Sequence, residues 1–243
     1  HPDSHLPSRF AMLQFKIAAS AAEREGAFRL VYANYLRQGL GAPNHFGMRV
    51  TPFHLLPTTT IFVAKLEDEV VATCTLVADG ELGLPLDAMY AGDVDRQRSR
   101  GIPLAEVSCL ADRRKSPSRF LGTFTTLTKL MAQYAQRQGI DELLAAVHPR
   151  HSRFYQRYLG FEPMAGLATC PHVQGQPAVG LRLSFSQSAI DNRAVYDMYF
   201  AEPLPESAFI TDEMSAEERT LYSQVCQESG LDLSAREPAG VAM

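Results

Sequence analysis

Apolar and polar residues follow two different periods along the chain, and these periods separate expected strands from expected helices. Short apolar runs between turn residues predict strands, and apolar residues that recur about every 3.6 positions predict helices. The clearest helix start is at Ser20, which has a capping-box partner in Glu23. We expect strands at 15–18, 60–65, 70–77, 104–111, 141–147 and 178–185, and helices at 21–38, 120–138, 151–158, 190–200 and 216–229.

The segments between these elements are expected to form loops or short turns. Residues 42–58 and 163–178 contain several prolines and predict loops, 82–90 is an irregular apolar segment, and 93–100 predicts a short polar helix or turn. Strands and helices mixed in this order predict an α/β fold, in which helices cover both faces of one mixed β-sheet.

One acidic residue, Glu106, interrupts the apolar strand 104–111. A carboxylate inside such a strand is costly unless it is paired or used. A basic loop and then helix 120–138 follow, and this layout is typical of a site that binds a phosphate-bearing ligand. The alternative is an ordinary core strand whose Glu106 points to solvent at its edge.

Charge is unevenly distributed in a chain whose formal net charge is −4. Residues from 187 onward carry 11 acidic and 3 basic side chains, whereas residues 1–186 have a net charge of +4. Seven basic residues lie between Arg96 and Arg119. A basic patch beside a candidate site suggests an anionic partner, such as nucleic acid, CoA, phosphopantetheine or an acidic carrier protein. A solvated basic surface is the alternative.

Composition indicates what kind of protein this is and in which environment we expect it. A hydrophobic content of 46% with 21% charged residues is typical of a globular core. The four cysteines lie far apart, so we expect reduced thiols and a cytoplasmic protein. No apolar run approaches the roughly 18 residues of a membrane span, and the first residues do not resemble a signal peptide. His148 and His151 have no evident third ligand, so no metal is expected.

Two sets of residues resemble a known family. Phe154-Tyr155 followed by Gly160-Phe161 resembles the strand-and-helix ending of GNAT acyltransferases. The segments 83–87, 93–100 and 103–111 together resemble bacterial N-acyl amino acid synthases, which are GNAT-fold relatives of the acyl-homoserine lactone synthases. The likeness covers about residues 15–185, and the family pattern has an arginine where this chain has Cys109.

The resemblance implies a fold, a reaction and a division of the chain. It implies a GNAT-like acyltransferase domain at 14–186, which leaves a flexible lead at 1–13 and an acidic, partly helical extension at 187–243. It also implies an enzyme that transfers a long-chain acyl group from acyl carrier protein to the α-amino group of an amino acid, most often tyrosine. We therefore expect no nucleic-acid partner and no integral membrane association.

The loop after strand 104–111 bears on the acyl donor. In GNAT enzymes a glycine-containing loop at this place binds the CoA pyrophosphate, but residues 114–119 contain no glycine, and Pro117 has no N–H. This favours the phosphopantetheine of acyl carrier protein over CoA as donor, with no bound cofactor. The basic residues expected to dock the carrier protein are Arg114, Lys115, Arg119, Arg150 and Arg153.

Three residues are candidates for the chemistry that the resemblance implies. Glu106 would be the base that removes a proton from the acceptor ammonium. Ser108 faces the same side of the strand because side chains alternate with period two, and it would orient the acceptor or the base; Cys109 is expected on the other face. Tyr155 would protonate the departing thiolate, with Tyr158 as the alternative. A buried structural hydroxyl is the other interpretation of Ser108.

Substrate-binding candidates come from the same strand and from nearby apolar segments. Backbone N–H groups beyond Glu106 would polarise the thioester carbonyl as an oxyanion hole does. Apolar side chains would line a tunnel for the acyl chain, although each could instead belong to an ordinary core. The predicted substrate-binding residues are Leu110, Ala111, Arg113, Phe46, Phe53 and Phe124.

Three other functions remain possible on the sequence alone. One is a CoA-dependent N-acetyltransferase for a small amine, against which the loop 114–119 argues. Another is an acyl-homoserine lactone synthase, which would accept S-adenosylmethionine. The non-enzymatic alternative is a module that binds acyl groups or acyl carrier protein without turnover.

Overall fold

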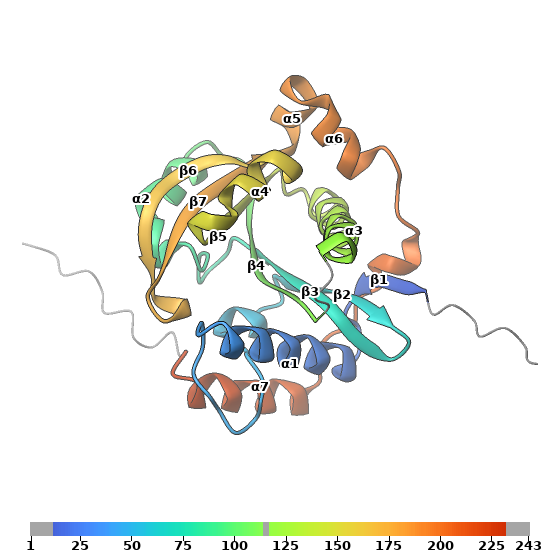
Figure 1. Cartoon of the computed structure of the whole chain (residues 1–243), viewed down its shortest axis with the longest axis vertical. Coiled ribbons are helices and arrows are strands. Elements are labelled where there is room, and N and C mark those ends of the chain that lie inside the picture. Colours follow the sequence, from blue (N-terminus) through green and yellow to red (C-terminus); the bar gives the residue numbers. More distant parts are fainter. Residues whose placement is uncertain (1–11, 114–116, 232–243) are drawn as a thin grey trace, which may run out of the picture.

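A single seven-stranded β-sheet forms the centre of the molecule (Figure 1). The computed structural model of the 243-residue chain describes residues 12–113 and 117–231, with the backbone alone at 117–120. The strand order is β1-β2-β3-β4-β5-β7-β6, and every neighbouring pair is antiparallel except the parallel pair β4–β5. The strands are β1 Leu13–Ile17, β2 Thr59–Leu66, β3 Glu69–Ala78, β4 Leu104–Asp112, β5 Glu142–Val147, β6 Glu162–Cys170 and β7 Gln176–Ser184.

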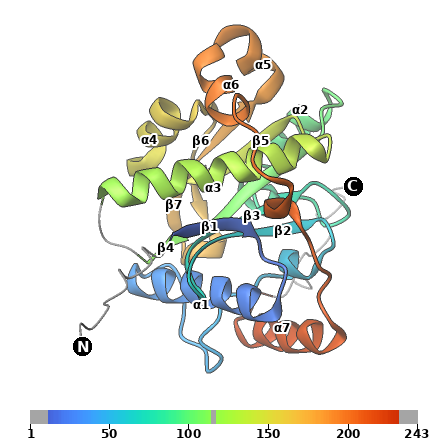
Figure 2. The same cartoon turned by 90° about the vertical axis from the view of Figure 1, so that its right-hand side faces the viewer.

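Helices cover both faces of this sheet, as the sequence predicts. Phe28 of α1 packs on Ile61 and Val63, and α2 packs on the same face, whereas α3 and α4 pack on the opposite face. Figure 2 shows α1 and α3 on opposite sides of the sheet. The helices are α1 Ala21–Arg37, α2 Asp87–Arg98, α3 Pro117–Arg137, α4 Pro149–Leu159, α5 Phe185–Asp191, α6 Arg193–Phe200 and α7 Ala216–Glu228, with short 3₁₀ turns at Pro52–Leu55, Pro171–Val173 and Glu206–Phe209.

The prediction of a loop at 163–178 was wrong, because β6 occupies residues 163–170 and β7 already begins at Gln176. β6 lies at the edge of the sheet and pairs only with β7, so Pro163 can take part without leaving a central ladder position unpaired. Register shifts on both sides of Ala165 break the alternation of apolar and polar residues that would reveal a strand. The segment 82–90 is likewise not wholly irregular, since α2 already begins at Asp87.

The described part of the C-terminal segment packs back onto the rest of the molecule. The Tyr199 hydroxyl of α6 donates to the Leu159 carbonyl oxygen at 2.9 Å, and its ring lies in the main core beside α3. On the opposite face, Arg24 of α1 donates to both carboxylate oxygens of Glu218 on α7, at 2.8 and 2.9 Å. α7 begins with a capping box, formed by Ser215 and Glu218.

The two central strands β4 and β5 separate part of the way along their length. Their register runs only from Leu104↔Glu142 to Glu106↔Leu144, although β4 continues to Asp112 and β5 to Val147. Polar groups of the separating ends are therefore available to a ligand instead of to a neighbouring strand. This separation lies directly after Glu106.

Candidate active site

A cavity of about 620 Å³ lies where β4 and β5 separate. β4 contributes every residue from Glu106 to Asp112 to its wall. The cavity reaches both faces of the sheet, because Tyr35 of α1 lines it from one side and Phe124 of α3 lines it from the other. Such a passage through the sheet gives two reactants access to the same strand from opposite directions.

A β-bulge shapes the β4 wall of this cavity. Thr73 pairs with Ala111 and Thr75 pairs with Ser108, so Cys109 and Leu110 together face one residue of β3. Cys109 adopts φ 51°, in the left-handed region that few residues other than glycine occupy. A bulge removes its extra residue from the regular ladder and re-aims the side chains that follow it. The backbone next to Ser108 therefore does not follow the regular hydrogen-bond ladder between β3 and β4.

The bulge also overturns one expectation from the sequence. Strict alternation places Cys109 on the face opposite Ser108 and Glu106, but Cys109 packs with Leu30 and Val31 of α1. This is the face that α1 and α2 cover, and Glu106 contacts the start of α2 there. Because one extra residue shifts the period-two pattern, Cys109 lies on the same side of the sheet as Glu106.

Glu106 is almost fully buried, with 4% of its surface exposed. Within the described chain, the one hydrogen bond to its carboxylate comes from the Leu86 backbone N–H, which donates to Oε2 at 2.7 Å. Burial raises the pKa of Glu106 well above its ordinary value, and nearby Asp87 raises this pKa further, although the Leu86 N–H opposes the rise. A carboxylate of raised pKa is a stronger base, so Glu106 has the properties that proton removal from an ammonium requires.

The tyrosine of the Phe-Tyr pair reaches the same cavity from α4. The Tyr155 ring packs against Phe124 and Phe161, with centroids 6.1 and 5.5 Å away, and its side chain lines the cavity. Burial raises the pKa of Tyr155 above its ordinary value, so its hydroxyl keeps its proton at neutral pH and can donate it. Tyr158, the alternative, is 47% exposed and does not line the cavity.

The structure brings most predicted site residues to this cavity, but not all of them. Phe46 instead packs beneath α1, with its ring 3.8 Å from that of His45. Arg113 is exposed and donates to Glu69 at 2.6 Å, and Arg153 is exposed on α4. None of these three residues lines the cavity; Arg153 lies on the exposed face of α4, whose Phe154 and Tyr155 do line it. The predicted residues that do line the cavity are Glu106, Ser108, Leu110, Ala111, Phe53, Phe124, Arg150 and Tyr155.

Part of the predicted docking surface cannot be placed. Arg114, Lys115 and the side chain of Arg119 lie outside the described residues. Arg150 is exposed at the cavity wall, at the start of α4. His148 caps this helix, since its Nδ1 accepts from the Arg150 backbone N–H at 3.2 Å.

Arg49 is among the charged residues of the cavity that sequence reasoning missed, with Arg37 and Asp112. Its guanidinium lies over the Tyr35 ring, 4.7 Å from the centroid, and its Nη2 donates to the His172 carbonyl oxygen at 2.5 Å. Residue 49 lies in the long segment 42–58, whose length suggested a function. This single arginine of the segment has no local sequence signal that marks it as a site residue.

Two kinds of feature are absent from the described residues, a metal-binding cluster and a membrane-spanning helix. No group of three or more His, Cys, Asp and Glu side chains lies together in a way that could hold a metal ion. None of the helices in the described parts of the chain has the length and hydropathy needed to cross a membrane.

The fold and the cavity together define an acyltransferase of the GNAT-like class. The separated β4–β5 pair, the buried Glu106 and the tyrosine on α4 are its distinguishing features here. Residues 26–184 match the family described as N-acyl amino acid synthase FeeM, which is more than half of the chain. The protein therefore belongs to the N-acyl amino acid synthase FeeM family and is an acyltransferase, as the sequence resemblance predicts.

Solved structures agree with this assignment. FeeM, an N-acyl amino acid synthase from uncultured soil microbes, is 28% identical, with a TM-score of 0.62 over 73% of this chain and 92% of that one. The acyl-homoserine lactone synthase LasI is 12% identical, with a TM-score of 0.56 over 84% of this chain and 98% of that one. BjaI, a CoA-dependent acyl-homoserine lactone synthase, is 13% identical, with a TM-score of 0.55 over 88% and 100%. The last two show a shared fold. A comparison with curated protein sequences gave no match.

Proposed function

We propose that the protein transfers a long-chain acyl group from acyl carrier protein to the α-amino group of an amino acid, with tyrosine as the acceptor. The observation that supports this most directly is the buried Glu106 at the wall of a cavity that Tyr155 also reaches. Base and acid are thus available on one passage through the sheet, which acyl transfer from a thioester to an amine requires.

The proposed reaction assigns one step to each group. Glu106 removes a proton from the acceptor ammonium, directly or through water, and the free amine attacks the thioester carbonyl carbon. Backbone N–H groups of bulged β4 stabilise the negative charge that develops on the carbonyl oxygen. The carbon–sulfur bond then breaks, and the Tyr155 hydroxyl gives its proton to the departing thiolate. The attacking nitrogen releases its second proton to water, and the Tyr155 phenolate regains a proton from water. The products are an N-acyl amino acid and the free thiol.

The donor is proposed to be acyl carrier protein for two reasons. The loop 114–119 lacks the glycines of a pyrophosphate-binding loop, which counts against CoA. Arg150 is exposed at the cavity wall and Arg153 is exposed on the same helix, so both are available to an acidic carrier. CoA thioesters remain the alternative donor, because they present the same phosphopantetheine arm and thioester.

The acyl chain needs an apolar part of the cavity. Leu110, Phe53 and Phe124 line the cavity, and Phe154 adds a further ring 5.5 Å from that of Phe124. These apolar side chains are proposed to hold the chain near its thioester. Ser108 lies beside them on β4 and is proposed to orient the acceptor.

An assay with separated donors tests the proposal. Purified protein receives tyrosine together with long-chain acyl carrier protein, the matching long-chain acyl-CoA or acetyl-CoA, and mass spectrometry measures the N-acyl tyrosine that forms. We expect turnover with the long-chain carrier thioester and little with acetyl-CoA. Turnover from acetyl-CoA alone contradicts the proposal, and acylation of S-adenosylmethionine in place of tyrosine reassigns the acceptor.

A further inference from the structure

Arg49 is a partly buried cation that has no anionic partner. In the described chain no carboxylate lies within 4.0 Å of its guanidinium, and its Nε is buried without a hydrogen-bond partner. Its polar contact is with a neutral group, the His172 carbonyl oxygen, at 2.5 Å. The guanidinium lines the cavity and rests on the Tyr35 ring.

Other buried or partly buried arginines of the described chain are paired with carboxylates. Arg24 binds both carboxylate oxygens of Glu218, and Arg98 binds the carboxylates of Asp79 and Asp87 at 2.6–2.8 Å. Removing a guanidinium from water without an opposite charge is unfavourable. The unpaired Arg49 is therefore suited to an anion that comes from outside the protein.

His172 connects Arg49 to the environment of Glu106. The His172 carbonyl oxygen accepts from Arg49, while its ring Nε2 lies 3.3 Å from the Pro85 carbonyl oxygen. The next residue, Leu86, donates its N–H to the Glu106 carboxylate at 2.7 Å. Three polar contacts, together with His172 and the Pro85–Leu86 peptide unit, thus join the cation and the base, so both belong to the same side of the cavity.

Cys109 of β4 lines the same cavity as Arg49 and Glu106. Burial raises the pKa of Cys109, the Arg49 cation opposes that rise, and the Glu106 carboxylate adds to it. Arg49 supplies a guanidinium to the cavity wall from the loop between α1 and β2.

We propose that Arg49 binds the α-carboxylate of the amino-acid acceptor and thereby presents its amino group to Glu106. The proposal rests on the acyl transfer to an amino acid proposed above. An α-amino acid carries its carboxylate and ammonium on the same carbon, so it fits between a fixed cation and a base. A guanidinium can donate two parallel hydrogen bonds to one carboxylate, which fixes both the position and the orientation of the acceptor.

The variant Arg49→Met tests this assignment, with Arg29→Met as its matched control. Methionine keeps an unbranched apolar stem and removes the charge, while Arg29 is an exposed arginine of α1 that pairs with Glu25. Steady-state kinetics are measured with tyrosine and with tyramine, which lacks the carboxylate. We expect Arg49→Met to raise the KM for tyrosine about 10- to 100-fold, the usual effect of losing a charged hydrogen-bonded contact. The KM values for tyramine and for the donor should change little.

Two kinetic outcomes overturn the assignment. If the KM for the donor rises while that for tyrosine does not, Arg49 serves the donor phosphate. If the KM values for tyrosine and tyramine rise by the same factor, Arg49 has a structural role. Arg49→Lys retains the charge and provides a second variant if Arg49→Met does not fold. It should keep part of the wild-type preference for tyrosine over tyramine.

A binding experiment separates this assignment from the proposed reaction. Calorimetry compares N-dodecanoyl tyrosine with N-dodecanoyl tyramine as probes, and it requires no turnover. Wild-type protein should bind the carboxylate-bearing probe about 10- to 100-fold more tightly, and Arg49→Met should remove the difference. Equal affinities in active wild-type protein overturn the Arg49 assignment and leave the reaction standing. A carboxylate preference that needs Arg49, in protein that acylates no amino acid, supports the assignment and overturns the reaction.

Discussion

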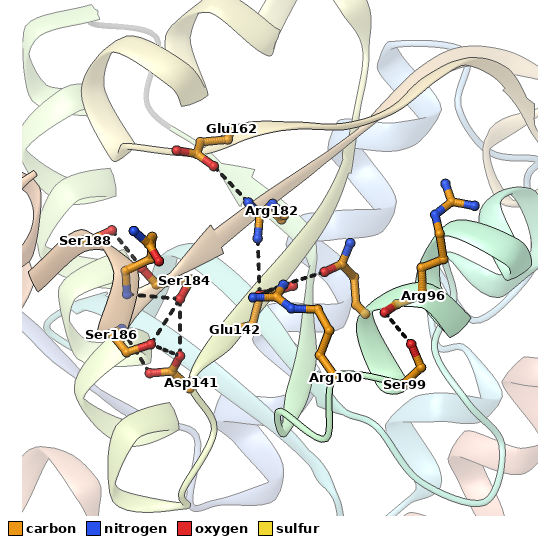
Figure 3. Close-up of polar contacts among 12 residues, drawn as sticks. Arg96, Ser99, Arg100, Asp141, Glu142, Glu162, Arg182, Ser184, Ser186 and Ser188 are labelled. Carbon is orange, nitrogen blue, oxygen red and sulfur yellow. Dashed lines mark hydrogen bonds and ion pairs between the residues drawn. The ribbon is translucent and has the colours of Figure 1, made fainter. Parts of the chain in front are cut away.

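Two buried glutamates on adjacent strands have very different surroundings. Glu142 at the start of β5 is 0% exposed, and its Oε2 lies 3.0 Å from Arg100 Nη1 and 3.5 Å from Arg182 Nη1 (Figure 3). Glu106 on β4 is 4% exposed and receives one backbone N–H, with Asp87 as its charged neighbour. Burial raises the pKa of both carboxyls, but arginines oppose that rise at Glu142 alone.

The difference separates a carboxylate that is paired with arginines from the one that we propose as the base. At Glu142, the two arginines compensate the charge where β5 begins beside β7, so its loss should affect folding first. At Glu106, only a neutral N–H donor offsets the cost of burying the carboxylate. The ionised form is therefore disfavoured, and the carboxylate accepts a proton more readily than an exposed one. Burial alone would not distinguish these residues, whereas their partners do.

The largest effect should come from Glu106→Gln. Glutamine keeps the shape and can accept the Leu86 N–H bond, but it cannot remove a proton, so turnover at neutral pH should fall at least about 100-fold. The melting temperature should stay the same or rise, because a disfavoured buried charge is removed. Acyl-transfer rates and thermal melts measure the two effects. A turnover within a few-fold of wild type would remove Glu106 from the chemistry.

The matched substitution Glu142→Gln should reverse this pattern. It leaves Arg100 and Arg182 without their shared carboxylate, and we expect the free energy of unfolding to fall by about 2 kcal/mol, the usual size of charged hydrogen bonds. Turnover per folded molecule should change less than about three-fold, since ordinary surface or structural changes leave the transition state untouched. Chemical denaturation, with activity normalised to folded protein, tests this. Unchanged stability combined with lost turnover would contradict the distinction between the two carboxylates.

Most of the fold could be predicted from local patterns, and the exceptions share a cause. The hairpin of β2 and β3 and the capping box at Ser20 depend on neighbouring residues, and both are confirmed. β6 was missed because Pro163 is tolerated at a sheet edge and because register shifts break its apolar–polar alternation. Its edge position follows from pairing with a strand further along the chain, which the local sequence does not reveal.

In the candidate site, likewise, residues with a local sequence signal were predicted and residues that depend on distant contacts were not. Glu106 stands out as an acid within an apolar run, and Tyr155 stands out through the family motif. Arg49 had no such local signal, because its importance depends on His172, which is 123 positions away. The face of Cys109 was predicted wrongly, since the bulge that turns it is a property of the pairing between β3 and β4.

A smaller effect should come from Tyr155→Phe. The hydroxyl is proposed to protonate a thiolate, which is already a good leaving group, so turnover should fall only about 10-fold, at the low end of acid–base effects. Tyr158→Phe on the same helix is the control, and its rate should equal that of wild type because Tyr158 is exposed outside the cavity. Single-turnover rates measure the difference. If Tyr158→Phe is the slower variant, the acid must be reassigned to Tyr158.

The smallest expected effect is the change in the free energy of unfolding with pH that Glu106 causes. Its folded-state pKa lies well above the ordinary value of 4.5, so between these two values the folded protein holds a proton that the unfolded chain has released. The free energy of unfolding should therefore fall as pH rises through this window, by up to about 1.4 kcal/mol per pH unit, and level off above it. Over the same window, turnover should rise as Glu106 loses its proton.

Comparison with Glu106→Gln isolates this contribution, because Glu142 also has a raised pKa and contributes with the same sign in both proteins. Denaturation at a series of pH values should show the variant gaining stability relative to wild type as pH rises from about 5. A constant difference between the two proteins would mean that Glu106 titrates normally in the folded state. The buried carboxyl would then lack the raised basicity on which its assignment as the base depends.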